Sequence, residues 1–284
     1  MKRSSGSSGF LKKMAYYFFH NCNLPNLFNI YIYHYWLSFS KFSNTPRMRH
    51  LIDQIQRELR ANADPQHRDQ LVWFFKEQPV DPIGVRSKEM NILVARFWRE
   101  IKAWDKEQIW TLCDALWETI ILENGHLACK FAFRVDKRLD SVDFDIFSGW
   151  LHNHIYNWAH CDDLCAKALG EILVRYPTTI DETANWHASP NRWVRRGLAV
   201  SMLPSLKKNM HIDHTLDVAD RLLLDEDDLV QKGYGWMLKV ASQTCPDTVY
   251  QFVLDRRDRM PRTALRYAIE KLPADMRKEA MKKV

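Results

Sequence analysis

Trp158 and Asp162 lie four residues apart and are the residues of this sequence with the clearest chemical potential. On a helix they would lie one turn apart on the same face. The indole would supply a π surface and the carboxylate a negative charge, so together they could hold a cationic or oxocarbenium-like group. The local alternative is a core tryptophan beside a solvated, helix-capping aspartate. Two later segments, around Arg196 and Trp236, favour the functional interpretation.

Helices must position these residues, because nearly the whole chain from residue 48 onward shows helical periodicity. Leu51, Ile55 and Leu59 repeat at helical spacing. Asp105 followed by Gln108 resembles a capping box. Further helices are predicted at residues 143–156, 161–175, 190–203, 213–224, 227–243, 246–255, 261–271 and 273–283. No stretch in this region alternates as a strand does, so the predicted fold class is all-α.

A faint repeat indicates that the helices come in pairs. The segment 194–200 (Val-Arg-Arg-Gly-Leu-Ala-Val) resembles the segment 230–236, and the segment 261–267 resembles both more weakly. In each segment a basic residue precedes a small residue that permits close helix packing. The first two segments begin 36 residues apart. A period of this length fits stacked HEAT-like pairs, so we expect a right-handed superhelical solenoid with a concave basic groove. Arg196, Lys232 and Arg262 would line that groove; solvated surface charge is the alternative.

The composition fits a folded chain with an anionic partner. Of the 284 residues, 46% are hydrophobic and 27% are charged, which disfavours intrinsic disorder. The 9 glycines are few for an all-β protein with many tight turns. A net charge of +6 suits a polyanion without establishing one. The six scattered cysteines form no regular framework and no secretory signal is evident, so we expect a reduced, cytoplasmic protein.

Residues 1–47 differ from the rest of the chain. No Lys, Arg, Asp or Glu occurs between Met14 and Ser40, and this length would permit a membrane span. Asparagine, proline and histidine residues interrupt the stretch and are costly at the centre of a bilayer. We therefore expect an accessory or poorly ordered extension rather than a membrane anchor, followed by a single domain at residues 48–284.

Three segments together resemble the HEAT-like-repeat alkylpurine DNA glycosylases, the AlkD type of DNA alkylation repair enzyme. They are the helix with Trp158 and Asp162, the run 192–199 (Arg-Trp-Val-Arg-Arg-Gly-Leu-Ala) and the run 230–238 (Val-Gln-Lys-Gly-Tyr-Gly-Trp-Met-Leu). The resemblance covers residues 48–284 and is strongest from 150 to 270. It implies a partner, double-stranded DNA containing alkylated purines, and a monomer that needs neither a cofactor nor a metal.

The resemblance implies a catalytic role for Asp162, because the family's catalytic aspartate lies four residues after a helix-borne tryptophan. Trp158 is then that tryptophan. A second active-site tryptophan follows a Lys-x-x-Gly run and corresponds to Trp236. Asp163 is adjacent to Asp162, so the phase of the helix decides which carboxylate faces the cleft. The spacing from Trp158 favours Asp162.

The resemblance also implies contacts with the DNA backbone and with the lesion. An arginine that reaches the backbone follows a Trp-x-x pattern, which places it at Arg196 after Trp193. A family tyrosine upstream of a Gly-Val turn corresponds to Phe75, where the hydroxyl is missing. Phe75 and Trp193 are the candidate lesion contacts. The further candidates for backbone contacts are Lys232, Arg195 and Arg262.

This constellation suits one particular reaction. An N3- or N7-alkylated purine carries positive charge and is already a good leaving group. The remaining barrier lies at the sugar, where positive charge develops at the anomeric carbon, and an ionised Asp162 would stabilise that charge and position a water. Most glycosylases extrude the base into a pocket, whereas the resembled family works without a tight one.

Other functions remain open at this point. A non-catalytic solenoid that binds damaged, bent or branched DNA would keep the groove without the chemistry, and a protein-interaction scaffold would need neither. The spacings of the neighbouring histidines and cysteines match no standard zinc pattern, so no metal site is predicted there. These residues are His152, His154, His160, Cys161 and Cys165.

Overall fold

The computed structural model describes residues 45–282, and within them the chain is a succession of helices without a strand. Residues 1–44, which hold most of the predicted N-terminal extension, lie outside the described residues. The α-helices are α3 (Pro46–Ala61), α4 (Pro65–Phe74), α5 (Ser87–Ile101), α6 (Lys106–Trp117), α7 (Leu122–Val135), α8 (Asp143–Asn153), α9 (Trp158–Asp163), α10 (Gly170–Arg175), α11 (Arg192–Val200), α12 (Leu203–Lys207), α13 (Ile212–Arg221), α14 (Asp228–Ala241), α15 (Pro246–Leu254), α16 (Arg262–Ala268) and α17 (Ala274–Ala280).

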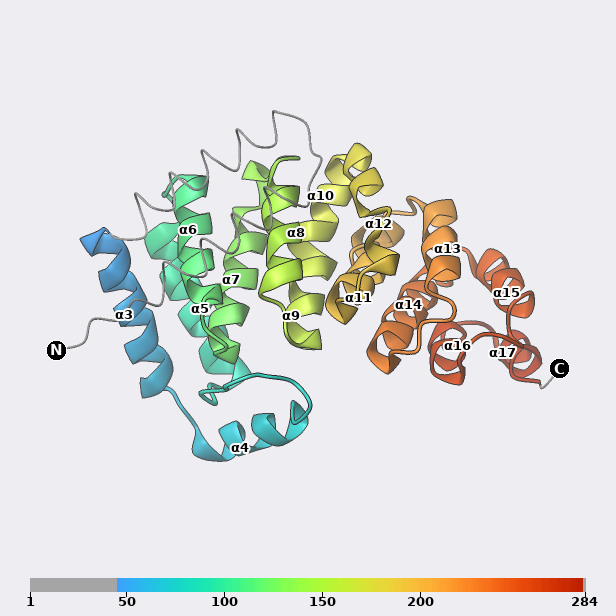
Figure 1. Ribbon diagram of the computed structural model, residues 1–284, viewed down its shortest axis with the longest axis horizontal. Coiled ribbons are helices and arrows are strands. Elements are labelled where there is room, and N and C mark those ends of the chain that lie inside the picture. Colours follow the sequence, from blue (N-terminus) through green and yellow to red (C-terminus); the bar gives the residue numbers. More distant parts are fainter. Residues whose placement is uncertain (1–44, 283–284) are drawn as a thin grey trace.

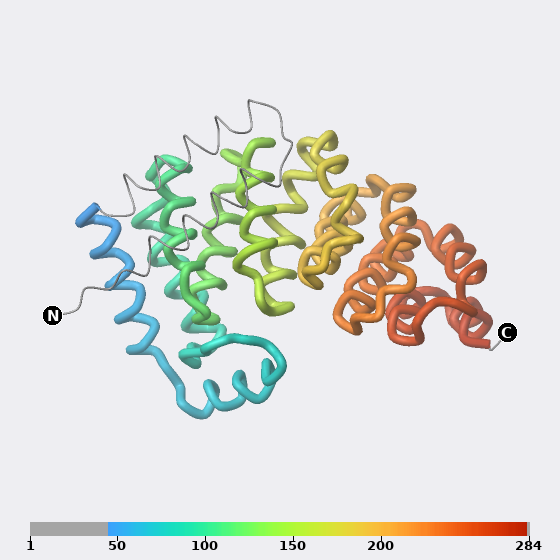
Figure 2. Tube along the Cα trace, in the orientation of Figure 1, coloured from blue at the N-terminus to red at the C-terminus, as the bar shows by residue number. Residues whose placement is uncertain are grey.

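The helices follow one another along the long axis of the molecule, from α3 at one end to α17 at the other (Figures 1 and 2). Helices α5, α7, α9, α11, α14 and α16 each pack against the next and form one row. We call it the site row, because it carries every predicted site residue except Phe75. Helices α6, α8, α13 and α15 pack behind it as a support row. The all-α fold of paired helices is therefore confirmed.

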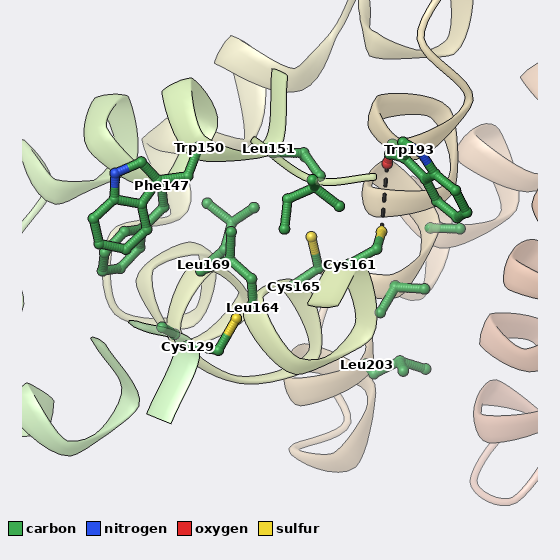
Figure 3. Packing of buried hydrophobic residues seen from close by; sticks show 14 of the residues in the cluster. Cys129, Phe147, Trp150, Leu151, Cys161, Leu164, Cys165, Leu169, Trp193 and Leu203 are labelled. Carbon is green, nitrogen blue, oxygen red and sulfur yellow. Dashed lines mark hydrogen bonds between the residues drawn. The ribbon is translucent and has the colours of Figure 1, made fainter. Parts of the chain in front are cut away.

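Helix α9 is the first part of a longer helix that runs to Arg175. A π-helical segment, η2 (Leu164–Leu169), joins α9 to α10 directly after the two aspartates. Its wider turn accommodates one extra residue, a device that is often found at functional sites. The buried side of this helix, with Cys161, Leu164 and Cys165, packs against Leu151 and Trp193 (Figure 3). The opposite side carries both aspartates, which are less buried than these core residues.

Helix α4 lies apart from both rows (Figure 1). None of its residues is buried. The loop that follows it is nevertheless fixed, because the Glu123 carboxylate on α7 accepts hydrogen bonds from the amides of Ile83, Gly84 and Val85. Gly84 has a φ of 97°, a conformation that L side chains rarely adopt. The loop that follows α4 is thus attached to the first turn of α7.

The predicted helices agree closely with the observed ones, including the capping box at Asp105 and Gln108. The segment after α10 is different from the expectation, since it holds two short 3₁₀ helices, η3 (Pro177–Thr183) and η4 (Trp186–Ala188). Between residues 45 and 282 no helix has the length and hydropathy that crossing a membrane requires.

Gly235 lies where α14 and α16 pack closely against each other. A Cβ on Gly235 of α14 would lie 2.7 Å from the Cβ of Tyr267 and 2.9 Å from the Ala264 carbonyl oxygen of α16. Gly149 of α8, by contrast, has open space around the same position. The two glycines therefore form a matched pair for substitution.

We predict that Gly235→Ala lowers the free energy of unfolding by about 1–3 kcal/mol, because α14 and α16 must separate. Gly149→Ala should raise it by about 0.5–1 kcal/mol, because alanine favours the helix and meets no neighbour. Urea unfolding of both variants and the wild-type protein measures these changes. Equal effects of the two substitutions would contradict the packing of α14 on α16.

Candidate active site

The helix that carries Trp158 and Asp162 begins at an anchored turn. Asn157 precedes α9 with extended backbone, and its Oδ1 accepts a hydrogen bond of 2.9 Å from the amide of His160. Its Nδ2 lies 2.8 Å from Nδ1 of the same histidine. An asparagine at this position satisfies an amide that the first helical turn leaves without a partner. Because α9 starts at Trp158, Asp162 follows it one turn later, as predicted.

His160 ties the start of α9 to α7. Its Nε2 lies 2.8 Å from the Leu122 carbonyl oxygen. Since a carbonyl only accepts, we infer that Nε2 carries the proton and that Nδ1 accepts from the Asn157 amide. A Cβ on Gly125 would overlap the imidazole ring, so the glycine makes room for it. Burial, with a smaller contribution from His126, lowers the pKa of His160 to about 3.

Asp162 forms a two-point ion pair with Arg196 of α11. The guanidinium Nε lies 2.8 Å from Oδ1 and Nη2 lies 2.8 Å from Oδ2. This side-on geometry holds the carboxylate plane in one orientation. The Asp162 side chain is 18% exposed, and each of its oxygens keeps a second lone pair for another donor.

A third contact fixes Arg196. Its Nη1 donates to the Leu229 carbonyl oxygen in the first turn of α14, and its stem packs against Gly233, where a Cβ would lie 3.2 Å away. The Arg196 side chain is 7% exposed. Burial would lower the pKa of this guanidinium, but the hydrogen bonds to Asp162 outweigh burial and raise it. Arg196 therefore stays charged and keeps only two N–H groups for further acceptors.

Burial raises the pKa of the Asp162 carboxyl, and the hydrogen bonds from Arg196 oppose that shift. We take the carboxylate as ionised at neutral pH, because an arginine that cannot lose its proton donates to both of its oxygens. The candidate site thus holds a fixed negative charge that is partly shielded from water. A charge in such a place acts more strongly on a developing cation than it would in bulk solvent.

Asp163 faces the other neighbour of α9. Its Oδ1 lies 2.9 Å from Nζ of Lys130 and also contacts Nζ of Lys167, and its Oδ2 lies 3.4 Å from Nδ1 of His126. Burial would raise the pKa of Asp163, but the hydrogen bonds from these three groups hold it well below its usual range. The helix phase therefore directs Asp162 toward α11 and Asp163 toward α7.

Aromatic side chains surround Trp158. The Phe75 ring stacks on its indole with 5.8 Å between centroids, and the Phe74 ring meets the indole edge-on at 5.7 Å. The Trp158 amide donates to Oε1 of Gln78. Phe74 is 55% exposed and the preceding Trp73 is 72% exposed, whereas Phe75 is buried. The end of α4 thus forms an aromatic wall beside Trp158.

The other predicted basic residues have different surroundings. Arg195 pairs with Asp225 at 2.6 Å, away from Asp162. Lys232 pairs with Asp228 one turn earlier on α14, at 2.5 Å. Arg262 is exposed at the first turn of α16 and forms no ion pair within residues 45–282. Only Arg196 of the four is therefore joined directly to the candidate catalytic carboxylate.

Trp193 and Trp236, the other two tryptophans among the predicted site residues, differ in burial. Trp193 of α11 is buried, and its carbonyl oxygen accepts a hydrogen bond from the Cys161 thiol at 3.5 Å (Figure 3). Trp236 of α14 is partly buried against the hydrophobic core. It belongs to the same helix as the Leu229 carbonyl that anchors Arg196. Trp193 is thus enclosed in the core, whereas Trp236 keeps an accessible surface.

No group of three or more His, Cys, Asp or Glu side chains in the described part of the chain is arranged to hold a metal. The hydrogen bonds of His160 explain its position without one. Sequence reasoning missed Asn157, His126, Lys130 and Lys167 as neighbours of the site. The four-residue spacings from His126 to Lys130 and from Asp163 to Lys167 could have indicated them, because residues four apart lie on the same face of a helix.

Comparisons with known proteins agree with this architecture. A family model described as DNA alkylation repair enzyme matches residues 55–272. A protein from Enterococcus faecalis, described as a predicted DNA alkylation repair enzyme, has a TM-score of 0.68 at 20% identity and covers 75% of this chain and 98% of its own. AlkD2 from Streptococcus mutans has a TM-score of 0.50 at 20% identity, with 66% of this chain and 90% of its own covered. No curated protein sequence matches the chain.

Arg196 and Lys232 both occupy the repeated basic position, but the ion pair of Arg196 is largely buried and that of Lys232 is exposed. We predict that Arg196→Ala lowers the free energy of unfolding by about 3–5 kcal/mol, because it leaves the Asp162 charge largely buried without its partner. Lys232→Ala should change it by less than about 1 kcal/mol, since that pair is exposed. Chemical unfolding of both variants measures the difference. Similar losses would show that the Asp162–Arg196 pair carries no special stability.

The His160 environment predicts a pH dependence of stability. Its pKa falls from 6.5 to about 3 on folding, so the folded protein favours the neutral ring. The resulting stabilisation is complete above about pH 6.5 and is lost as the pH decreases toward 3. His160→Gln should therefore show a shallower fall in the free energy of unfolding between pH 6.5 and pH 4 than the wild-type protein. The exposed His152→Gln serves as control and should keep the wild-type slope; an unchanged slope in His160→Gln would contradict the prediction.

Proposed function

Since this chain belongs to the DNA alkylation repair enzyme family, we propose that it acts as a DNA glycosylase that releases N3- or N7-alkylated purines from duplex DNA. The observation that carries this proposal is the Asp162 carboxylate, held by Arg196 in one orientation and facing the same side of α9 as Trp158. A charge fixed in this way is what stabilisation of a sugar cation requires.

The reaction is a hydrolysis. Alkylation at N3 or N7 places positive charge on the purine, so the base leaves with the electron pair of the glycosidic bond and needs no proton from the enzyme. Positive charge then develops at the anomeric carbon of the deoxyribose. Asp162 stabilises that carbon and accepts a proton from the attacking water, which yields the free alkylpurine and an abasic site.

Arg196 acts in this proposal mainly as a positioning residue. Its contacts with Asp162 and with the Leu229 carbonyl prevent rotation of the carboxylate. The two N–H groups that remain are the ones available for a backbone phosphate. Lys232 and Arg262, which lie farther along the site row, are proposed as additional phosphate contacts. Arg195 is also proposed as a phosphate contact, but its ion pair with Asp225 must break first.

Aromatic surfaces flank the proposed reaction centre. Trp158 on α9 and Trp236 on α14 are both partly exposed. Their π faces favour a neighbouring cationic centre, so both are proposed to pack against the deoxyribose. Phe75 supports Trp158 from behind through the stacked contact and has no hydroxyl to offer DNA. Trp193 is buried, which makes it a support for α11 in the first instance.

One observation also favours a second candidate, a non-catalytic protein that binds damaged or bent DNA. Both oxygens of Asp162 already accept hydrogen bonds from Arg196, and the same ion pair would serve a purely structural role. In that case phosphate contacts alone would determine the affinity for DNA. The two candidates differ in a single measurable property, the release of a base.

We predict that the wild-type protein releases alkylpurines from methylated duplex DNA and that Asp162→Asn does so at least about 100-fold more slowly, because the amide cannot stabilise the sugar cation. Affinity for the same DNA should not decrease, because the substitution removes a negative charge and leaves Arg196 in place. Mass spectrometry of the released base measures the rate. Asp217→Asn, which removes an exposed carboxylate on α13, is the control and should retain full activity.

Equal rates for Asp162→Asn and the wild-type protein would remove Asp162 from the mechanism. Tight binding of duplex DNA without any release of base by the wild-type protein would favour the non-catalytic candidate.

A further inference from the structure

Three basic side chains converge on Asp163, the residue that follows the candidate catalytic aspartate. Lys130 and His126 come from α7, and Lys167 comes from η2. Both lysines contact the same oxygen, Oδ1, and His126 contacts Oδ2. We call these four residues the Asp163 cluster. Asp163 directly follows Asp162 in the sequence, so the cluster adjoins the Asp162–Arg196 pair.

Cations outnumber anions in the Asp163 cluster. One carboxylate faces two ammonium groups, and His126 adds a further charge when it is protonated. On α11 and α14, by contrast, the three arginines and Lys232 each have a carboxylate of their own. These pairs are Arg192–Asp227, Arg195–Asp225, Arg196–Asp162 and Lys232–Asp228. Burial, with a smaller contribution from the neighbouring Lys167, lowers the pKa of Lys130.

The basic groups of the cluster remain accessible, whereas its carboxylate does not. The side chains of His126, Lys130 and Lys167 are 29%, 30% and 34% exposed, against 11% for Asp163. An ammonium carries three N–H donors, and Asp163 accepts one from each lysine. The cluster therefore offers hydrogen-bond donors and surplus positive charge to an anion that arrives from solvent.

A further arginine extends the cluster along α7. His126, Lys130 and Arg134 are spaced four residues apart, so they follow one face of the helix at intervals of about 6 Å. Arg134 is exposed and forms no ion pair within the described residues 45–282. A line of evenly spaced cations suits a linear polyanion better than a single small anion.

We propose that His126, Lys130, Lys167 and Arg134 bind the phosphates of one DNA strand beside the candidate active site. This inference rests on the proposed function and locates a part of the duplex that the predicted residues on α11, α14 and α16 do not reach. Asp163 holds the lysine side chains extended in free protein and competes with the phosphate. When a phosphate arrives, it takes over hydrogen bonds that Asp163 accepts and neutralises the surplus charge.

The alternative is that the cluster only joins α7 to η2. The two possibilities differ in the effect of removing Asp163. If the cluster binds phosphate, Asp163→Asn frees both lysines and strengthens DNA binding. If the cluster is structural, the same substitution costs stability and leaves affinity changed only by the added net charge. Asp217→Asn is the matched control, because Asp217 also pairs with a cation four residues later but lies on α13 in the support row.

The experiment measures the dissociation constant for an undamaged duplex oligonucleotide at several salt concentrations. Lys130→Gln, Lys167→Gln and Arg134→Gln should each weaken binding and reduce the slope of log affinity against log salt by about one unit. Arg221→Gln, the cationic partner of Asp217, should leave the slope unchanged. Asp163→Asn should tighten binding more than Asp217→Asn does. Thermal unfolding confirms that each variant is folded, and Arg134→Gln breaks no ion pair of the described residues.

Two outcomes would overturn the inference. Unchanged slopes in all three cationic variants, in a protein that itself binds DNA with a steep salt dependence, would reject the phosphate site and leave the proposed function intact. Equal effects of Asp163→Asn and Asp217→Asn on the affinity for DNA would likewise reject the phosphate site and leave the proposed function intact. Absence of any binding of the wild-type protein to duplex DNA would instead reject the proposed function, and the phosphate site with it.

Discussion

The ion pair between Asp162 and Arg196 is the contact on which the site row depends. It joins three consecutive helices of the row, because Arg196 on α11 donates both to the side chain on α9 and to the Leu229 carbonyl on α14. A buried charge is tolerated only when it is paired and hydrogen-bonded. Any change in the spacing of these helices would therefore separate charges in a place with little water. The carboxylate of Asp162, which is proposed to take part in the chemistry, is also one partner of the ion pair that sets the helix spacing. A change in the geometry of the site therefore also disturbs the packing of these helices.

Two adjacent aspartates on α9 have opposite electrostatic environments. The pKa of Asp162 is raised, chiefly by burial, whereas three basic groups hold that of Asp163 well below its usual range. A helix turns by about 100° per residue, so neighbours in sequence face different helices. Since α11 supplies one fixed guanidinium and α7 supplies a lysine and a histidine, Asp162 has a single positive partner whereas Asp163 has several.

The sequence predicted the parts of the site that depend on local spacing. Trp158 and Asp162 share a helical turn because four residues separate them, and the capping pair at Asp105 and Gln108 has a similarly local signal. The resemblance to a known family supplied the roles. The pairing of Arg196 with Asp162 could not be predicted in this way, because the two are 34 residues apart and Lys232, with the same local pattern, finds its partner within its own helix. The space that Gly125 leaves for His160 is equally non-local.

Helix α4 has a consequence for how such a protein can change over evolutionary time. None of its residues is buried, yet its end supplies the aromatic wall beside Trp158. The attachment of the following loop to Glu123 on α7 holds the backbone that follows α4, so the side chains of the earlier turns of α4 can change without moving that attachment. Substitutions and length changes in α4 would therefore alter the surroundings of Trp158 while the two rows of helices stay as they are. Under the proposed function, such changes would alter which alkyl adduct is recognised at little cost to folding.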